Sequence, residues 1–145
     1  MRTLLRSTRR VFSIAPACLA AGLLSACAGP EQLPNAQYTL SERQTLTLAP
    51  LVPDQRLTLT YEEANDSRCP DNARCMWAGQ LAYRFTLRIN NVAQAFWLVQ
   101  GKPGYTSPAL RGSRIELDPS FTPPARGMND SRPATYPVVF NMYGS

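Results

Sequence analysis

The residues that could do chemistry are few in this sequence, and the cysteines are the most informative of them. Histidine is absent from the 145 residues, which removes the commonest general base and the commonest metal ligand. The chain also lacks the Ser-x-x-Lys and Gly-x-Ser-x-Gly spacings of two well-known kinds of serine nucleophile. We therefore expect a non-enzymatic protein without a cofactor. An enzyme that works with serine, tyrosine or carboxylates is the weaker alternative.

Cys27 ends a segment that is typical of an export signal. Residues 1–10 carry four arginines and no acid. The apolar stretch that follows, about 14 to 16 residues, is shorter than the roughly 20 that a helix needs to cross a bilayer. Leu24-Ser25-Ala26-Cys27 resembles the bacterial lipobox, in which the cysteine thiol is acylated before cleavage. The sequence predicts a lipoprotein signal peptide over residues 1–26 and a lipidated Cys27, with an ordinary secretory signal as the alternative.

The residues around Cys27 also predict where the protein resides. By resemblance to other lipoproteins, Ala28 after the cysteine indicates sorting to the outer membrane. We expect an envelope protein that faces the periplasm, with the membrane as its partner through the lipid on Cys27. Thr8-Arg9-Arg10-Val11-Phe12 resembles the twin-arginine motif, which leaves export of an already folded chain open as an alternative route.

Cys69 and Cys75 remain once the other two cysteines are assigned, because Cys18 falls in the signal and Cys27 takes the lipid. In an oxidising compartment this pair predicts a disulfide. The closed loop is short, so the bond is expected to contribute about 2 to 2.5 kcal/mol. A metal site is the rejected alternative, since two thiolates without histidine do not complete a zinc tetrahedron.

The charge of the processed chain argues against a nucleic-acid partner. Removal of residues 1–26 from the 145-residue chain leaves 119 residues with 11 basic and 10 acidic side chains. The basicity of the full sequence therefore resides in the signal, and the domain itself is close to neutral. A chain of this length is about the size of a single domain with one modest core.

The residues around the cysteine pair carry a resemblance. The run from Asp66 to Gly79 opens with Asp-Ser-Arg-Cys-Pro and closes with Trp-Ala-Gly, with five residues between the cysteines. It resembles the signature of a family of small bacterial lipoproteins and secreted domains, and the likeness extends over roughly residues 57–143 with mild departures at Asn72-Ala73 and Met76. The resemblance implies a β-domain in the envelope, but no settled activity.

The same run permits a structural and a functional interpretation. As a structural staple, Arg68 pairs with Asp66 or with loop carbonyls, Trp77 covers the sulfurs, and Gly79 permits a close approach of backbone. As a recognition surface, Arg68, Arg74 and Trp77 contact a carboxylate-bearing or glycan-like ligand, since loops on a rigid frame commonly bind. A third hypothesis is a calcium site. Its ligands would be Glu62, Glu63, Asp66 and Asp71.

The elements that must position these residues are strands. Apolar residues recur with period two in short segments separated by prolines, and no convincing 3.6 period occurs after the signal. The predicted strands centre on Leu46–Leu48, Leu57–Tyr61, Leu81–Ile89, Ala93–Val99, Ile115–Leu117 and Val138–Met142. Asn90-Asn91 predicts a tight hairpin turn. This pattern favours an all-β fold, an immunoglobulin-like sandwich over residues 37–145 behind a lipidated tether over residues 27–36, with a small barrel as the alternative.

Two further features concern side chains and loops. Phe96 and Trp97 point to opposite faces of their strand, and we expect core packing for both. Residues 101–105 and 122–137 are expected to be loops, the second long enough to form a lid, a binding loop or a mobile segment. Taken together, the sequence predicts a non-enzymatic envelope domain that binds an envelope protein or a glycan. A structural subunit of an envelope assembly is the alternative.

Overall fold

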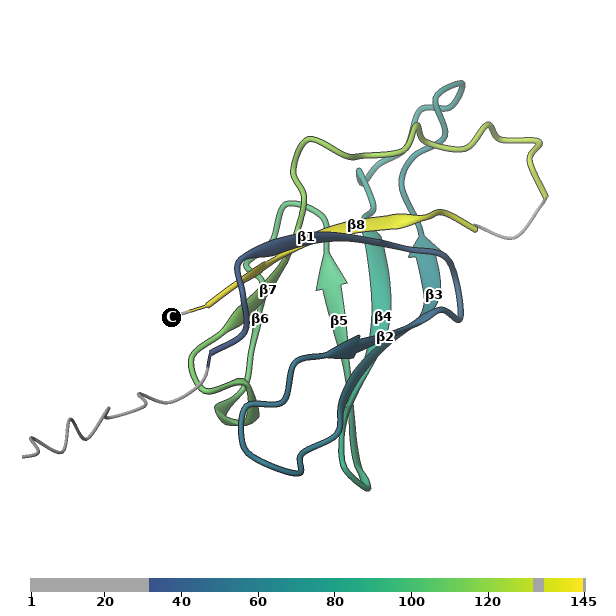
Figure 1. Ribbon diagram of the computed structural model, residues 1–145. Coiled ribbons are helices and arrows are strands. Elements are labelled where there is room, and N and C mark those ends of the chain that lie inside the picture. The colour runs from purple at the N-terminus through teal and green to yellow at the C-terminus, as the bar shows by residue number, and fades with distance from the viewer. Residues whose placement is uncertain (1–31, 132–134, 145) are drawn as a thin grey trace, which may run out of the picture.

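The computed structural model describes residues 32–131 and 135–144, and within them the chain folds into two antiparallel four-stranded sheets packed face to face (Figure 1). The strands are β1 (Ala36–Leu40), β2 (Thr45–Leu48), β3 (Leu57–Asp66), β4 (Leu81–Ile89), β5 (Val92–Val99), β6 (Tyr105–Thr106), β7 (Arg114–Leu117) and β8 (Val138–Tyr143). One sheet has the order β1-β8-β7-β6 and the other the order β2-β3-β4-β5. The predicted all-β sandwich is confirmed. The barrel alternative is wrong, because the two sheets do not close on each other.

The predicted signal peptide and Cys27 lie outside the described residues. The first described residues lie beside the C-terminal residues. Leu33 is buried in the core, and the backbone N–H of Gly144 donates to the side chain of Asn35 at 2.7 Å. No helix in residues 32–131 and 135–144 has the length and apolar character needed to span a bilayer.

Alternation of apolar and polar residues places the core between the sheets. The inward side chains of β3 and β4 are buried while their neighbours face outward. At the centre, the ring of Phe85 on β4 meets the ring of Phe140 on β8 edge to face, with centroids 5.6 Å apart. Tyr61 and Phe96 also pack on Phe85. This aromatic cluster joins the sheets and makes the sandwich a rigid support for its loops.

The strands expected from the sequence are present, with two additions. Asn90 has a positive φ of 53° in the two-residue turn between β4 and β5, as the predicted hairpin requires. The sequence interpretation missed β1, which pairs with β8, and β6, which begins at Tyr105 in a predicted loop. β1 alternates over only five residues, with Ala36 and Tyr38 half-buried and Leu40 buried, and β6 has two residues, so neither is long enough to give a clear period-two signal.

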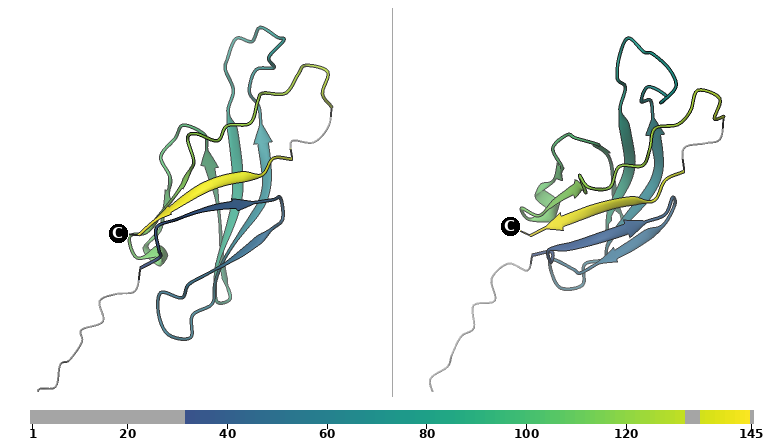
Figure 2. Two further views of the ribbon diagram at one scale, coloured as in Figure 1. Left: turned by 45° about the horizontal axis from the view of Figure 1, so that its top comes forward. Right: turned by 90° about the horizontal axis from the view of Figure 1, so that it is seen from above.

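Two long connections lie at the same end of the sandwich. Residues 67–80 join β3 to β4 and hold both cysteines, and we call them the disulfide loop. Residues 118–137 join β7 to β8, and we call them the proline-rich connection. Figure 2 shows the two side by side in both views, with the C-terminal end of the chain away from them.

Candidate functional site

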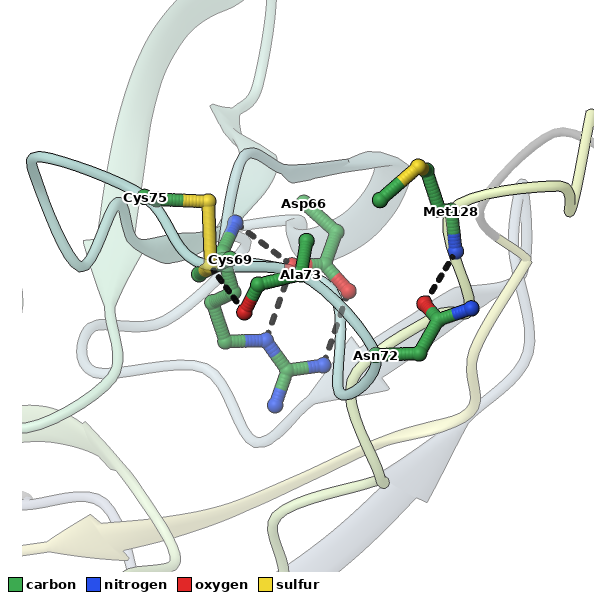
Figure 3. The surroundings of a disulfide bond; sticks show 7 residues. Asp66, Cys69, Asn72, Ala73, Cys75 and Met128 are labelled. Atoms are coloured by element: carbon green, nitrogen blue, oxygen red, sulfur yellow. Dashed lines mark hydrogen bonds and ion pairs between the residues drawn. A yellow bond between two sulfur atoms is a disulfide. The ribbon is translucent and has the colours of Figure 1, made fainter.

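The disulfide loop is closed by the predicted bond between Cys69 and Cys75, whose Cα atoms lie 5.8 Å apart. Further bonds hold the loop backbone inside and around this ring, whose disulfide is drawn in Figure 3. The backbone N–H of Cys69 donates to the carbonyl of Ala78 at 3.0 Å, and that of Ala73 donates to the carbonyl of Pro70 at 3.0 Å. The loop therefore has one fixed shape and projects as a compact unit from the sheet.

The base of the loop depends on a close approach of its two arms. The backbone N–H of Ser67 donates to the carbonyl of Gln80 at 2.9 Å, and the backbone N–H of Gln80 donates back to the Ser67 hydroxyl at 3.1 Å. Gly79 has a φ of +66°, and a Cβ at this position would stand 1.8 Å from the carbonyl oxygen of Ser67. The arms can meet only because residue 79 is glycine.

The arm that leaves β3 is locked to Asp66, the last residue of that strand, and we call residues 66–69 the inner segment. Arg68 and Asp66 form a two-pronged ion pair, with Nε to Oδ1 at 2.8 Å and Nη2 to Oδ2 at 2.7 Å. The Asp66 side chain is 3% exposed and the Arg68 side chain 18%. Because both charges are largely withdrawn from water, each depends on the other for its compensation.

Arg68 also ties the proline-rich connection to the disulfide loop. Its Nη1 donates to the carbonyl of Pro123 at 2.8 Å and its Nη2 to the carbonyl of Pro124 at 3.2 Å. A second tie joins the same two segments, since the backbone N–H of Met128 donates to the side-chain oxygen of Asn72 at 2.8 Å (Figure 3). The connection, expected to be a lid, a binding loop or a mobile segment, is therefore fixed to the disulfide loop at these two places.

Two tyrosines complete the lock from the core side. The hydroxyl of Tyr136 donates to Oδ2 of Asp66 at 3.3 Å, and the hydroxyl of Tyr61 donates to the backbone carbonyl of Tyr136 at 3.0 Å. Through these bonds the ion pair is connected to β3 and to the residues just before β8. Sequence reasoning did not assign this role to either tyrosine, because only the fold brings residues 61, 66 and 136 together.

The ionisation states follow from these contacts. Burial alone would raise the pKa of the Asp66 carboxyl, but the hydrogen bonds and charge of Arg68 outweigh burial and lower that pKa below its ordinary value. The hydrogen bond to Asp66 raises the pKa of Arg68. Burial raises the pKa of the Tyr136 phenol. Burial also raises the pKa of the phenol of Tyr83, on β4, to about 12. At neutral pH the pair is therefore fully charged and both phenols are neutral.

The arm that returns to β4, residues 74–77, contrasts with the inner segment, and we call it the outer segment. Met76 is 88% exposed and Trp77 is 79% exposed. Trp77 thus does not cover the sulfurs, and the expectation that it forms a lid is wrong. The guanidinium of Arg74 is also exposed and makes no ion pair or hydrogen bond with any described residue. Two large apolar side chains and a cation are therefore displayed on a rigid loop.

The structure separates the three residues that the sequence proposed as binding contacts. Arg74 and Trp77 lie on the outer segment and face solvent, whereas Arg68 is held by Asp66 and the two proline carbonyls. This placement favours the structural interpretation for Arg68. It leaves Arg74 and Trp77 as candidate binding residues.

The calcium hypothesis finds no support in the arrangement of its four acids. Asp66 is bound by Arg68, and Glu63 pairs with Arg84 at 3.2 Å across the sheet. Within residues 32–131 and 135–144 no three of the carboxylates and thiols converge in a way that could hold a metal ion. We therefore discard the calcium site as an interpretation of this loop.

One aromatic side chain differs from its expectation. Phe96 is buried at 8% exposure, as predicted, but Trp97 is 46% exposed on the outer face of its sheet. The period-two pattern correctly predicted that the two rings lie on opposite faces of the sheet. The error was to place both rings in the core, although only one face of this sheet is covered by the other sheet.

Comparisons of the chain with protein-family models, with curated proteins and with solved structures gave no match.

Proposed function

We propose that this chain is a lipid-anchored, non-enzymatic binding domain of the bacterial envelope and that the outer segment of its disulfide loop contacts a partner protein. The observation that carries the proposal is the exposure of Met76 and Trp77, at 88% and 79%, beside Arg74, an exposed residue that forms no ion pair with any residue the structure describes. Tryptophan and arginine are enriched at the energetic centres of protein interfaces, and methionine is enriched in protein interfaces as a whole. An exposed tryptophan beside a methionine has no role in the core and fits such a centre.

The rigidity of the loop supports a binding role. Association costs free energy for every side chain and loop that must be ordered. Here the disulfide, the contacts of the two arms and the clamp of Arg68 already hold the backbone of the loop. A partner would therefore meet a surface whose backbone needs no rearrangement, so ordering of the loop would offset little of the free energy gained from the apolar contact of Trp77.

The direction of the loop agrees with an anchor on Cys27. The first described residues enter the sandwich near Leu33, next to Gly144. The disulfide loop projects from the end of the sandwich that lies away from these residues (Figures 1 and 2). A chain tethered at Cys27 would present this loop away from the bilayer. We include in the proposal an immunoglobulin-like use of the sandwich, in which a rigid two-sheet frame carries recognition loops at one end.

The experiment that tests the proposal is photocrosslinking in intact cells that carry the full-length chain. A photoreactive amino acid replaces Met76, and in a matched control it replaces Val92, which is 70% exposed at the start of β5, at the end of β4 far from the disulfide loop. We expect a discrete crosslinked species from position 76 in the membrane fraction, its loss in the Trp77→Ala background, and no such species from position 92. Cys27→Ser is expected to move the chain out of the membrane fraction. The same pattern from both positions, or none from position 76, contradicts the partner surface.

A further inference from the structure

A second exposed aromatic lies on the outer face of the sheet that contains β3, β4 and β5. Register aligns Asn65, Ala82 and Val99 in one row across these strands, and Trp97 lies two residues before Val99 on β5. Side chains two residues apart on a strand share a face. The indole of Trp97 therefore stands beside this row, on the face that the other sheet does not cover.

These side chains surround a hollow of about 310 Å³. It is lined by Asn65, Gln80, Ala82, Trp97 and Val99. Ala82 forms the floor, since it faces outward but is only 5% exposed. The volume is at the lower end of the roughly 300 to 1,000 Å³ of small-molecule sites. The hollow suits a unit the size of one ring rather than an extended ligand.

The lining is neutral and combines two kinds of chemistry. Trp97 and Val99 offer an aromatic face and an aliphatic wall, while Asn65 and Gln80 offer side-chain amides that both donate and accept. Neither amide side chain is hydrogen-bonded to any described residue. Arg84, the register neighbour of Trp97 on β4, is paired with Glu63 at 3.2 Å. The lining of the hollow itself contains no charged side chain.

We infer that this hollow is a binding site for a neutral saccharide, with one pyranose ring stacked on Trp97. A pyranose has an apolar face of C–H groups, which fits an indole, and a rim of hydroxyls, which fits amides that can donate and accept. A purely apolar ligand would leave the amides of Asn65 and Gln80 unsatisfied when it covered them. An anionic ligand would find no cation in the lining. A ligand with both an apolar face and neutral polar edges can pack on Trp97 and Val99 and also form hydrogen bonds with Asn65 and Gln80.

The walls are held in place before any ligand arrives. Asn65, Ala82, Trp97 and Val99 are on paired strands, and Gln80 is fixed by its backbone bonds to Ser67 at the base of the disulfide loop. Sites built on strands keep their geometry better than sites on free loops. This inference does not depend on the partner protein proposed for the outer segment, because the hollow shares no residue with that segment.

The two tryptophans of the chain make the inference testable by fluorescence. In the full-length chain, Trp77→Phe leaves Trp97 as the only tryptophan, and Trp97→Phe leaves Trp77. The probes are maltohexaose, cellohexaose and chitohexaose. We expect at least one of them to change the emission of the Trp77→Phe chain saturably and to leave the emission of the Trp97→Phe chain unchanged.

Two further variants separate the site from the fold, with binding followed by titration calorimetry. Trp97→Ala removes the stacking face and is expected to weaken binding at least about tenfold. Ala82→Leu keeps the tryptophan but fills the floor, and is expected to abolish binding while circular dichroism stays unchanged. Emission changes confined to Trp77, or no response to any of the three saccharides, would overturn the inference. Neither result bears on the crosslink from position 76, so the two proposals fail separately.

Discussion

The inner and outer segments of the disulfide loop show how a single short loop divides into framework and surface. Each segment contains an arginine, and the two arginines are only six residues apart. Arg68 in the inner segment donates to Asp66 and to two backbone carbonyls, whereas Arg74 in the outer segment makes no such contact with the described residues. The disulfide joins the two segments, so the order of the inner segment also restrains the outer one.

Residue type alone does not assign a role in this loop. Arg68 has a carboxylate two residues earlier and proline carbonyls from a distant connection within reach, and these contacts define its role. Trp77 has no comparable neighbour and remains exposed. The difference can be measured, because removal of a framework side chain lowers stability and removal of a surface side chain does not.

The largest expected effect is that of Arg68→Ala. Removal of the guanidinium leaves the Asp66 carboxylate buried without its partner and removes one of the two ties between the disulfide loop and the proline-rich connection. Breaking a buried pair in this way costs about 3 to 5 kcal/mol in the free energy of unfolding. Urea denaturation followed by circular dichroism measures the loss. The matched control is Arg74→Ala, expected to change the same quantity by less than about 0.5 kcal/mol. Equal effects of the two variants would abolish the distinction between the segments.

The pH dependence gives an independent check on the same pair. The folded state lowers the pKa of Asp66, so the stability that this ionisation contributes is fully present above the ordinary carboxyl pKa. It is lost as the pH falls through the lowered pKa of the folded state. The stability difference between the wild-type chain and Arg68→Ala should therefore shrink in acid. A difference that stays constant into strong acid would mean that packing, not the ion pair, accounts for the role of Arg68.

The next effect in size is that of the disulfide. The double variant Cys69→Ser with Cys75→Ser opens a loop of six-residue separation, and the chain-entropy model gives a loss of about 2 to 2.5 kcal/mol in the free energy of unfolding. Urea denaturation with and without reductant measures it, since reductant should destabilise the wild-type chain and leave the variant unchanged. Amide exchange should rise more at Ala73 than at Ser67, whose bond to Gln80 lies outside the ring. Equal protection at both sites in the variant would contradict the division of the loop.

Much of the fold could be predicted from the sequence, because burial of one sheet face imposes a period of two on the long strands. Leu81–Ile89 displays that period over nine residues, and its partner strand follows an Asn-Asn turn. The missed strands, β1 and β6, pair with β8 and β7 and contribute only a few side chains to the core, Tyr38 and Leu40 from β1 and Tyr105 from β6. Pairing of this kind leaves little trace in local sequence. The choice between sandwich and barrel likewise depends on strand order, which periodicity does not encode.

The site could be predicted only where its contacts are local. The pair of Asp66 and Arg68 is two residues apart and was expected, as was the disulfide. The bonds to Pro123 and from Tyr136 span 55 and 70 residues and depend on how the proline-rich connection crosses the end of the sandwich. The structural interpretation, in which Trp77 covers the sulfurs, was wrong for the same reason, since it assumed that a large apolar ring in a short loop finds cover.

The smallest expected effect on stability is that of Trp77→Ala, and it decides whether the outer segment is surface. A tryptophan that packed over the disulfide would cost about 3 to 5 kcal/mol on truncation to alanine. With 79% of its surface exposed, Trp77 should instead change the free energy of unfolding by less than about 0.5 kcal/mol. Trp97→Ala, which removes a ring that is 46% exposed, is the matched control and should lose more. A loss above about 2 kcal/mol for Trp77→Ala would mean that the ring closes over the loop in solution, and the crosslink expected from position 76 would then lose its physical basis.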